Sequence, residues 1–487
     1  MGLGYNRASA FTHTRCHMPC LETVHAVRSA WLASSGIFTV FDPEFGDGES
    51  FNALLHLPSG AATPKALLRY VAVCEKPGTP LAPGLHFLNL PQHRAELHLH
   101  AGAGKAALAE LQGKYDAVMH PDADRQFSRW IRREPAASTK PRNVAVVGAG
   151  IAGSSVALAL CNQGIEVQLF DQASDPAAGA SGNWVGAFHP HITRGDSPLS
   201  RLSRLGFEHT VQALEALSLQ GLLEKGVDWD TPGHLQTVPV EEFERTQDTL
   251  AQLNFPPELV RWVQPNEVLP TPLGGLFFPK GGWVKPARWV QANLQACGGL
   301  LSTHFDCRLT DIAALRARFD AVVVCCAEQS LELAPIEGAR AGAVKGQISK
   351  LSAAGKPGLV LSGESYAIAP GAENWMVLGA TYERPVLDLN PTAEADELNI
   401  ARFKAAFPDL PVGELLDHRC AVRSVWHDRL PAIGPVPNMP NVYMSTGFAS
   451  RGLLWAALGG WIVAGHCMGQ PFESKLLGKI TPRAAKA

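Results

Sequence analysis

The chain has 487 residues, a formal net charge of −3 and 46% hydrophobic residues, which is enough apolar material for several buried cores. A net charge so close to zero excludes nucleic-acid binding through overall charge, so any such contact needs a local patch. The 10 cysteines are scattered and form no disulfide framework. We therefore expect reduced thiols in a soluble, cytoplasmic protein without a signal peptide.

The first 133 residues have α/β character. One strand pattern ends at Asp42 and runs into a glycine turn that contains Gly46 and Gly48. A second strand pattern ends at Glu75, where an acid can bind a ribose. This arrangement is typical of a turn that binds S-adenosylmethionine.

The strongest motif follows a linker, 134–141, that has two prolines among small polar residues. A β-branched strand enters Gly148-x-Gly150-x-x-Gly153, and a helix of small residues and a second strand then lead to Asp171. Glycines at these positions allow a tight turn, close approach of a pyrophosphate and close packing of helix on strand. The helix N-terminus attracts phosphate, and the acid accepts hydrogen bonds from a ribose. We infer that the chain binds a dinucleotide.

The loop 179–183 supplies small residues that can lie against a cofactor, among them Ala180, Ser181 and Asn183. Further on, Pro286 begins a predicted helix. The run 320–327 has the composition of a buried parallel strand.

A second glycine-rich turn lies near the end of the chain, after a predicted strand over 441–445. It contains Gly447, Ser450, Gly452 and Leu453. The segment 452–472 has no Asp, Glu, Lys or Arg, and we interpret it as a buried helix of the nucleotide domain rather than a membrane span. A cofactor held by two such turns favours FAD over NAD.

The region from Val144 onward resembles the glycine oxidase and D-amino-acid oxidase superfamily of FAD enzymes. Within it, the chain is most similar to the flavin module of the family of bifunctional tRNA 5-methylaminomethyl-2-thiouridine biosynthesis proteins, MnmC. The resemblance lies in the glycine loop and in the segments GASGN at 179–183, GGLFFPKGGWVKP at 274–286, KGQIS at 345–349, LGATY at 378–382, RCAVRSVWHDRLPAIG at 419–434 and GFASRGL at 447–453.

The resemblance implies a flavin oxidation of a secondary amine. In that family the FAD module oxidises the carboxymethylaminomethyl group on the wobble uridine of tRNA, which yields aminomethyluridine and glyoxylate. Arg423 and Arg451 fall where such enzymes place arginines that bind a carboxylate. Tyr366 and Tyr382 are candidates to line the pocket, although an aromatic side chain on a strand is more often part of a core.

The expected fold class is α/β. A Rossmann-type FAD-binding domain with an interleaved α+β substrate domain is preceded by a truncated, Rossmann-like methyltransferase segment. We expect FAD-binding parts at about 142–232, 320–345 and 420–470, substrate parts at about 233–319 and 346–419, and a basic, loosely ordered tail at 471–487.

The N-terminal segment departs from the methyltransferase half of that family. Glu44 and Ser50 stand where the family has a glycine and an asparagine, and the family's Asp-Gly-Phe-Ala-Pro signature is absent from 116–122. We expect a degenerate segment without methyl transfer, in which Asp42, Gly46, Gly48 and Glu75 are the residues still able to contact S-adenosylmethionine.

Two departures lie in the flavin module. Glu328 replaces a glycine that is usual beside the adenine, and Lys345 stands where arginine is common. Neither changes the predicted fold.

Other candidate sites rest on weaker patterns. Four potential metal ligands, His13, Cys16, His17 and Cys20, match no zinc module, so we expect no metal. Two basic groups are candidate contacts for tRNA phosphates, although charge runs are usually only solvated. They are Arg125, Arg129, Arg132 and Arg133 around Trp130, and Lys475, Lys479 and Arg483 in the tail.

Two alternatives remain open. One is an oxidase of free small amines, such as glycine or sarcosine, against which the N-terminal segment argues. The other is an inactive FAD-binding scaffold, which Glu44 and Glu328 favour. The tRNA species, the electron acceptor and the oligomeric state are not indicated.

Overall fold

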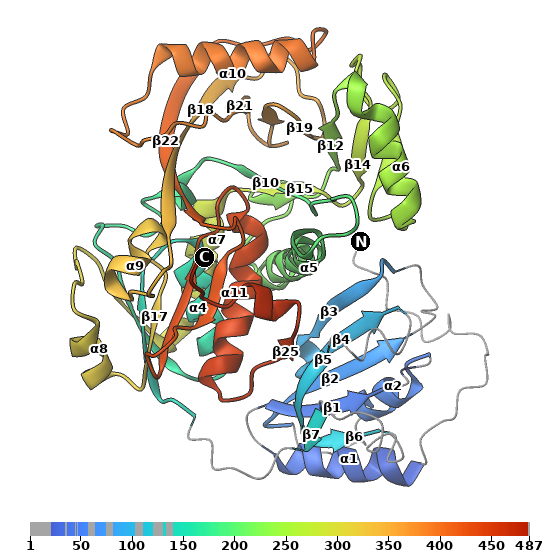
Figure 1. Cartoon of the computed structure of the whole chain (residues 1–487), viewed down its shortest axis with the longest axis vertical. Helices are drawn as coiled ribbons and strands as arrows, with labels where there is room; N and C mark the ends of the chain where they lie inside the picture. Colours follow the sequence, from blue (N-terminus) through green and yellow to red (C-terminus); the bar gives the residue numbers. More distant parts are fainter. Residues whose placement is uncertain are drawn as a thin grey trace. The chain divides into compact units, whose positions relative to one another are not determined.

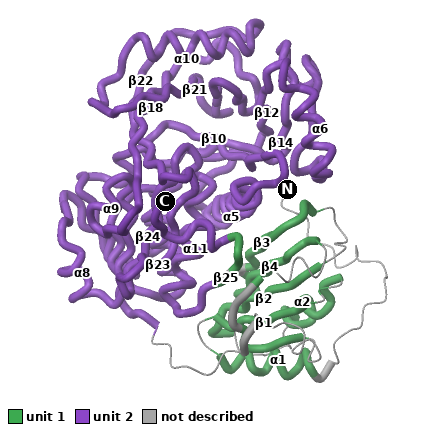
Figure 2. The backbone as a smooth tube through the Cα atoms, in the orientation of Figure 1, with its two compact units in different colours: residues 1–139, 472–476 green, residues 140–471, 477–487 purple. Residues whose placement is uncertain are grey.

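The computed structural model describes residues 21–34, 37–43, 45, 47–56, 64–74, 81–102, 111–119, 130–132 and 140–485. The chain divides into two compact units (Figure 2). Unit 1 comprises Met1–Thr139 with Phe472–Leu476, and unit 2 comprises Lys140–Pro471 with Leu477–Ala487.

Unit 1 is built on a five-stranded sheet of order β3-β4-β2-β1-β6. Strand β3 is antiparallel to β4, and the other neighbours are parallel. Its core gathers Trp31, Phe51, Leu54 and Tyr70. The elements are α1 (Leu21–Ala33), β1 (Ile37–Asp42), α2 (Glu49–Leu55), β2 (Leu67–Cys74), β3 (Gly84–Leu90), β4 (Ala95–Ala101) and β6 (Ala117–Val118), with a small sheet of β25 (Glu473–Ser474), β5 (Leu111–Tyr115) and β7 (Trp130–Arg132).

Unit 2 contains a six-stranded sheet of order β16-β9-β8-β17-β24-β23, parallel except for the edge strand β23. Every residue of β17 is buried, as a strand with both faces covered requires. Helices α4, α7 and α11 pack together beside it (Figure 1). The elements are β8 (Asn143–Val147), α4 (Ile151–Cys161), β9 (Glu166–Phe170), α7 (Pro286–Ala296), β16 (Leu301–His304), β17 (Ala321–Val324), β23 (Ala432–Pro435), β24 (Val442–Thr446) and α11 (Gly452–Cys467).

The apolar helix α11 is enclosed by protein, as the sequence predicts. It packs against α4 and against α5 (Pro198–Leu219). A Cβ at Gly460 would lie 2.5 Å from the carbonyl oxygen of Ser155, so glycine is needed where these two helices meet. Among the described residues, no helix is long and apolar enough to span a membrane.

The second large element of unit 2 is an eight-stranded mixed sheet of order β13-β14-β12-β19-β20-β21-β18-β22. Helix α10 (Ala393–Ala406) covers one of its faces (Figure 1). The strands are β12 (His234–Thr237), β13 (Arg261–Val263), β14 (Gly275–Phe278), β18 (Ala341–Ser352), β19 (Val360–Ser362), β20 (Tyr366–Ile368), β21 (Trp375–Gly379) and β22 (Leu415–Trp426).

Alternation along the strands sorts the side chains of this sheet into two sets. Leu351, Leu361 and Leu378 pack with Phe403 of α10. Ile348 and its neighbours point to the opposite face, which we call the inner face.

Beside the inner face lies a small antiparallel sheet in which β15 pairs with both β10 and β11. Its strands are β10 (Gly186–Phe188), β11 (Trp229–Asp230) and β15 (Gly282–Val284).

Two boundary expectations were wrong. Residues 286–304, expected among the substrate parts, belong to the nucleotide-binding half, because α7 packs on α4 and β16 pairs with β9. Strand β16 is a mostly exposed edge strand and so has no hydrophobic signal. The tail after 470 was expected to be loosely ordered, but Ile480 is buried and its carbonyl accepts from the N–H of Ile433 at 2.7 Å.

Several sequence motifs lie outside the described residues. These are Gly46, Glu44, Glu75, the group His13, Cys16, His17 and Cys20, and the basic residues Arg125, Arg129 and Arg133.

Candidate active site

A cavity of about 820 Å³ lies within unit 2, between the inner face and the carboxyl ends of the parallel strands β8, β9, β17 and β24. Its size is within the usual range for cofactor sites, and the ends of parallel strands are where such ligands bind. Most of the residues proposed from the sequence line it, namely Gly148, Gly150, Asp171, Ala180, Ser181, Asn183, Tyr366, Arg423, Gly447, Ser450, Gly452 and Leu453. Gly153 and Arg451 do not.

The first glycine turn has the geometry that a dinucleotide requires. Gly148 has a φ of +108°, in the region that favours glycine. A Cβ at Gly153 would lie 1.8 Å from the carbonyl oxygen of Gly148, so Gly153 brings α4 against the turn without touching the cavity. A Cβ at Gly150 would lie 3.1 Å from Oγ of Ser181 and would narrow the approach to the helix N-terminus.

The acid at the end of β9 is tied to the same turn. One carboxylate oxygen of Asp171 accepts from the N–H of Ala149 at 2.6 Å, and the other accepts from the N–H of Ala173 at 2.8 Å. A carboxylate has about four acceptor sites, so two stay available to a ribose diol. The residues present therefore fit the adenosine part of FAD.

The loop 178–183 is held by an arginine that we did not propose from the sequence. Arg419 of β22 donates from Nη2 to the carbonyl of Gly179 at 2.8 Å and from Nε to Oδ1 of Asn183 at 3.3 Å. The Oγ of Ser181 in turn accepts from the N–H of Ile151 at 2.9 Å. The segment RCAVR contains both Arg419 and Arg423, but only the strand register shows which one reaches the loop.

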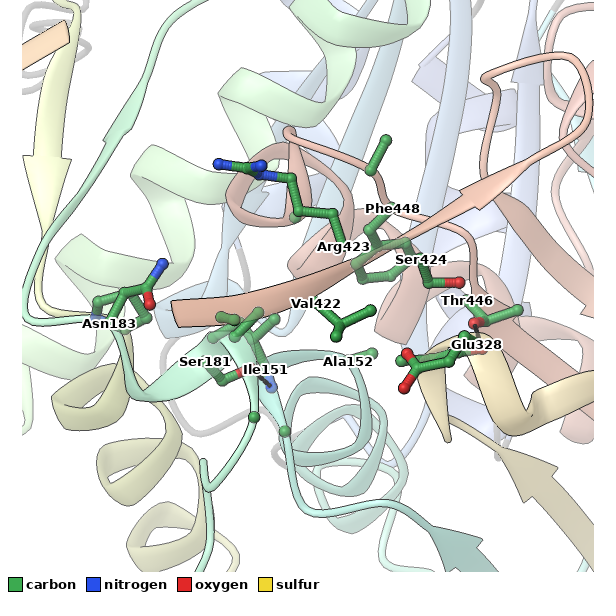
Figure 3. A pocket seen from close by; sticks show the side chains of 18 of the residues that line it. Ile151, Ala152, Ser181, Asn183, Glu328, Val422, Arg423, Ser424, Thr446 and Phe448 are labelled. Atoms are coloured by element: carbon green, nitrogen blue, oxygen red, sulfur yellow. Dashed lines mark hydrogen bonds between the residues drawn. The ribbon is translucent and has the colours of Figure 1, made fainter. Parts of the chain in front are cut away.

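The second glycine turn closes the other side of the cavity. Gly447 has a φ of +72°, and the hydroxyl of Thr446 donates to the carbonyl of Ala327 at 2.7 Å. This contact holds the loop that carries Glu328, which lies across the cavity from Arg423 in Figure 3. Burial, with the nearby Asp171 and Glu328 carboxylates, raises the pKa of Cys326 to about 12, so this thiol stays protonated.

Arg423 enters the cavity from the inner face without a carboxylate partner, and unlike Arg419 it is not bonded to the loop 178–183. Its guanidinium lies 4.5 Å from the ring centre of Tyr382, and Nη1 donates to the carbonyl of Thr381 at 3.1 Å. Among the described residues it forms no ion pair. Burial raises the pKa of Tyr366 to about 12 although Arg423 opposes the rise, so the phenol is neutral beside the guanidinium.

Lys345 of β18, the residue that stands where arginine is common, forms ion pairs with Glu383 at 3.3 Å and with Asp388 at 3.4 Å. It is therefore not a free cation.

Arg451 is the residue immediately before α11. Burial lowers its pKa, and the nearby Tyr382 opposes this. The charge of Arg451 also contributes to the lowered pKa values of His189 and His191. Arg451 therefore lies close to the cavity, although it is not one of the residues that line it.

Two histidines of the cavity were missed by sequence reasoning. The rings of His189 and His234 lie 4.0 Å apart, and Nε2 of His234 is 2.7 Å from the hydroxyl of Ser362. Nδ1 of His189 is 2.8 Å from the carbonyl of Pro190 and so carries the proton. Burial lowers the pKa of His189 to about 4 and that of His234 well below its usual value. No local pattern distinguishes them from core histidines.

In unit 1, two residues of the proposed S-adenosylmethionine turn are described. Asp42 is buried, and the hydroxyl of Tyr70 donates to its carboxylate at 2.5 Å. Gly48 has a φ of +84° at the start of α2, against the ring of Phe45.

Comparison with known proteins agrees with this geometry. Residues 143–465 match the family model described as FAD dependent oxidoreductase. The chain is 34% identical over 382 residues to the tRNA 5-methylaminomethyl-2-thiouridine biosynthesis bifunctional protein MnmC of Thiobacillus denitrificans, covering 72% of this chain and 61% of that protein. It is 30% identical over 395 residues to the protein of the same name from Cupriavidus necator, covering 70% and 60%.

Two solved structures share the fold. Glycine oxidase from Bacillus cereus has a TM-score of 0.62 at 19% identity and covers 71% of this chain and 100% of that chain. Iminodiacetate oxidase from Chelativorans has a TM-score of 0.60 at 23% identity, with the same coverage. The chain thus spans about three fifths of the length of the curated relatives named above and the whole of these oxidases.

Proposed function

The chain belongs to the FAD dependent oxidoreductase family, and from this premise we propose that it oxidises the carboxymethylaminomethyl group on the wobble uridine of tRNA. The CH2–NH unit next to the carboxylate loses two electrons and two protons and becomes a C=N imine. Water then hydrolyses the imine to glyoxylate and aminomethyluridine. The names of the two relatives support the tRNA substrate.

Binding of FAD is assigned to the two glycine turns. Asp171 would bind the ribose, and the turn at 148–153 with the N-terminus of α4 would bind the pyrophosphate. The turn at 447–453 would contact the other end of the cofactor. When bound, FAD supplies the two-electron acceptor.

The observation that carries the proposal is the unpaired guanidinium of Arg423 in the cavity wall. Its fork of N–H groups matches a carboxylate bidentately. The neutral phenol of Tyr366 lies nearby and adds no competing anion.

Two neutral histidines of the cavity wall, His189 and His234, add no positive charge to the cavity, and the nearby His191 is neutral as well. Burial lowers the pKa of His189 and of His191 to about 4, and it lowers the pKa of His234 well below its usual value. Because Nδ1 of His189 faces a carbonyl, its Nε2 keeps a lone pair that can accept a hydrogen bond from the N–H of a neutral substrate amine. A neutral amine has the lone pair that the oxidation requires.

We further propose that the methyl-transfer step is lost. The carboxylate of Asp42, the described acid of the candidate turn, is bonded to Tyr70 inside the core of unit 1. Glu44 and Ser50 stand where the related methyltransferases have glycine and asparagine.

The test mixes the FAD-loaded protein anaerobically with tRNA from cells that lack this activity, and follows the flavin absorbance and the digested nucleosides. Loss of absorbance with conversion to aminomethyluridine supports the proposal. Bleaching by glycine or sarcosine alone would instead place the protein among the free amine oxidases. Bound FAD that no substrate bleaches would favour the scaffold.

A further inference from the structure

Lys350 is a cation of unit 2 held between two aromatic rings. Its Nζ lies 4.7 Å from the ring centre of Trp375 and 5.3 Å from that of Trp184. All three side chains are partly exposed. Cation–π contacts of this kind fix the position of an ammonium and leave its three N–H donors free.

Within the part of the chain that the structure describes, the ammonium of Lys350 has no hydrogen bond and no ion pair. A nearby acid, Glu373, is hydrogen-bonded to other residues. Glu373 accepts from Nζ of Lys285 at 2.5 Å and from Nε1 of Trp375 at 2.9 Å. The hydrogen bond from Lys285 is the main cause of the lowered pKa of Glu373, which is therefore ionised and already paired.

The strand register places Lys350 on the inner face, in line with the cavity. Ile348 lies opposite Arg419, and Val344 lies opposite Arg423, so positions 344, 346, 348 and 350 share one face with both arginines. Gly346, over which the Arg423 guanidinium lies, is four residues from Lys350, or about 13 Å along the strand. Trp184 is flanked by Asn183 and Val185, which both line the cavity.

Asp417 is the residue directly opposite Lys350 on β22. It is exposed, and its carboxylate accepts from the N–H of His418 at 2.8 Å. No ion pair joins it to Lys350 in the described structure. Lys350 thus has two carboxylates near it, and its charge contributes to the lowered pKa of Glu373, but neither Glu373 nor Asp417 forms an ion pair with its ammonium in the described structure.

We propose that Lys350, positioned by Trp184 and Trp375, binds a backbone phosphate of the polynucleotide next to the reacting nucleotide. The inference rests on the proposed function, because it assigns a second contact to the same substrate. Arg423 would take the carboxylate on the modified base, and Lys350 would take a phosphate of the same strand, about 13 Å away along the inner face. A small free amine has no group to reach this position.

The test compares two substrates on the FAD-loaded, full-length protein. One is an anticodon stem-loop RNA that carries carboxymethylaminomethyluridine, and the other is the same modified nucleoside without phosphate. For Lys350→Ala, we expect KM for the RNA to rise roughly 3- to 10-fold while kcat and the kinetics of the nucleoside stay unchanged. Lys350→Arg should restore most of the RNA affinity. Loss of one phosphate contact should also lower the slope of log KM against log salt by about 0.7.

The matched control is Lys404→Ala, which removes the same charge from an exposed position on α10, over the opposite face of the sheet. Equal RNA kinetics for the Lys350 and Lys404 variants would overturn the inference and leave the proposed function intact. So would an equal rise in KM for the nucleoside, because it would assign Lys350 to the shape of the cavity. A wild-type protein that oxidises glycine or the nucleoside but not the RNA would overturn the tRNA proposal and this contact together.

Discussion

The guanidinium of Arg423 occupies the space that a side chain at residue 346 would fill. A Cβ at Gly346 would lie 2.1 Å from Nη1 of Arg423. The glycine of the KGQIS segment therefore leaves room for the arginine on the neighbouring strand rather than forming a turn, and a side chain at residue 346 would force this guanidinium to move.

Substitution Gly346→Ala should displace this guanidinium. We expect KM for the carboxylate substrate to rise about 10- to 100-fold, since a charge-assisted pair is lost, with FAD content unchanged. Steady-state kinetics and the flavin spectrum measure both quantities. Gly342→Ala on the same strand is the control, because its Cβ would meet its nearest atom at 3.9 Å. Similar KM values for the two variants would contradict the assignment of Arg423.

The two arginines of β22 should separate cofactor binding from substrate binding. Arg419→Ala removes the contacts to Gly179 and Asn183, so we expect weaker FAD binding and little change in KM once FAD is saturating. Arg423→Ala should raise KM for the substrate and leave FAD binding nearly unchanged. Fluorescence titration of FAD and substrate kinetics on each variant provide the test, and loss of FAD by both variants alike would argue against separate roles.

Asp171→Asn should weaken FAD binding by roughly 10- to 100-fold, because an amide replaces acceptors of the Ala149 and Ala173 N–H groups and of the ribose. Equilibrium titration of the FAD-free protein measures the change in Kd. Asp175→Asn is the matched control, since Asp175 is exposed and its carboxylate accepts a hydrogen bond from the neighbouring hydroxyl of Ser174. An unchanged Kd for the Asp171 variant would remove this acid from the cofactor site.

The buried histidines predict acid sensitivity. The pKa of His189 is about 4 in the folded protein, whereas the usual histidine value of 6.5 applies to the unfolded chain. Between these two pH values the unfolded chain therefore binds a proton at His189 and the folded protein does not. The contribution of His189 to stability is complete above pH 6.5 and is lost as the pH falls toward 4, by up to about 1.4 kcal/mol per pH unit.

Urea unfolding of the FAD-loaded protein at several pH values tests this dependence. His189→Gln should make the profile less steep in that window, where His191 and His234 still contribute, whereas His304→Gln, at an exposed position, should leave the slope unchanged. A wild-type stability that is level between pH 6.5 and 4.5 would contradict the low pKa values.

Unit 1 should not bind S-adenosylmethionine, since the carboxylate of Asp42 is fully buried as well as hydrogen-bonded to Tyr70. We expect no heat in a calorimetric titration of the full-length protein and no methyl transfer to aminomethylated tRNA. Tyr70→Phe should destabilise unit 1 by about 1–3 kcal/mol, because a buried carboxylate loses a hydrogen bond. Binding in the micromolar range would restore the methyltransferase assignment.

The nucleotide-binding fold was predictable because its signals are local. The elements of this motif follow one another directly in the chain, namely β8, the turn at 148–153, α4 and β9. Each glycine is needed for the local geometry of the turn to which it belongs. The absence of charge in 452–467 likewise predicted a buried helix. The edge strand β16 was assigned to the wrong half because an exposed strand of four residues has no hydrophobic pattern.

The candidate substrate side was decided by tertiary structure. His189 meets His234, Arg419 reaches the loop 178–183, and Lys350 lies between Trp184 and Trp375. The members of each group come from separate strands or loops, and no spacing in the sequence relates them. The antiparallel register of β18, β21 and β22 aligns the cations on one face, and only pairing across the sheet determines that register. The sequence by itself determined where a dinucleotide binds, because a turn is specified by neighbours in the chain, whereas the substrate-facing wall exists only once distant strands have paired.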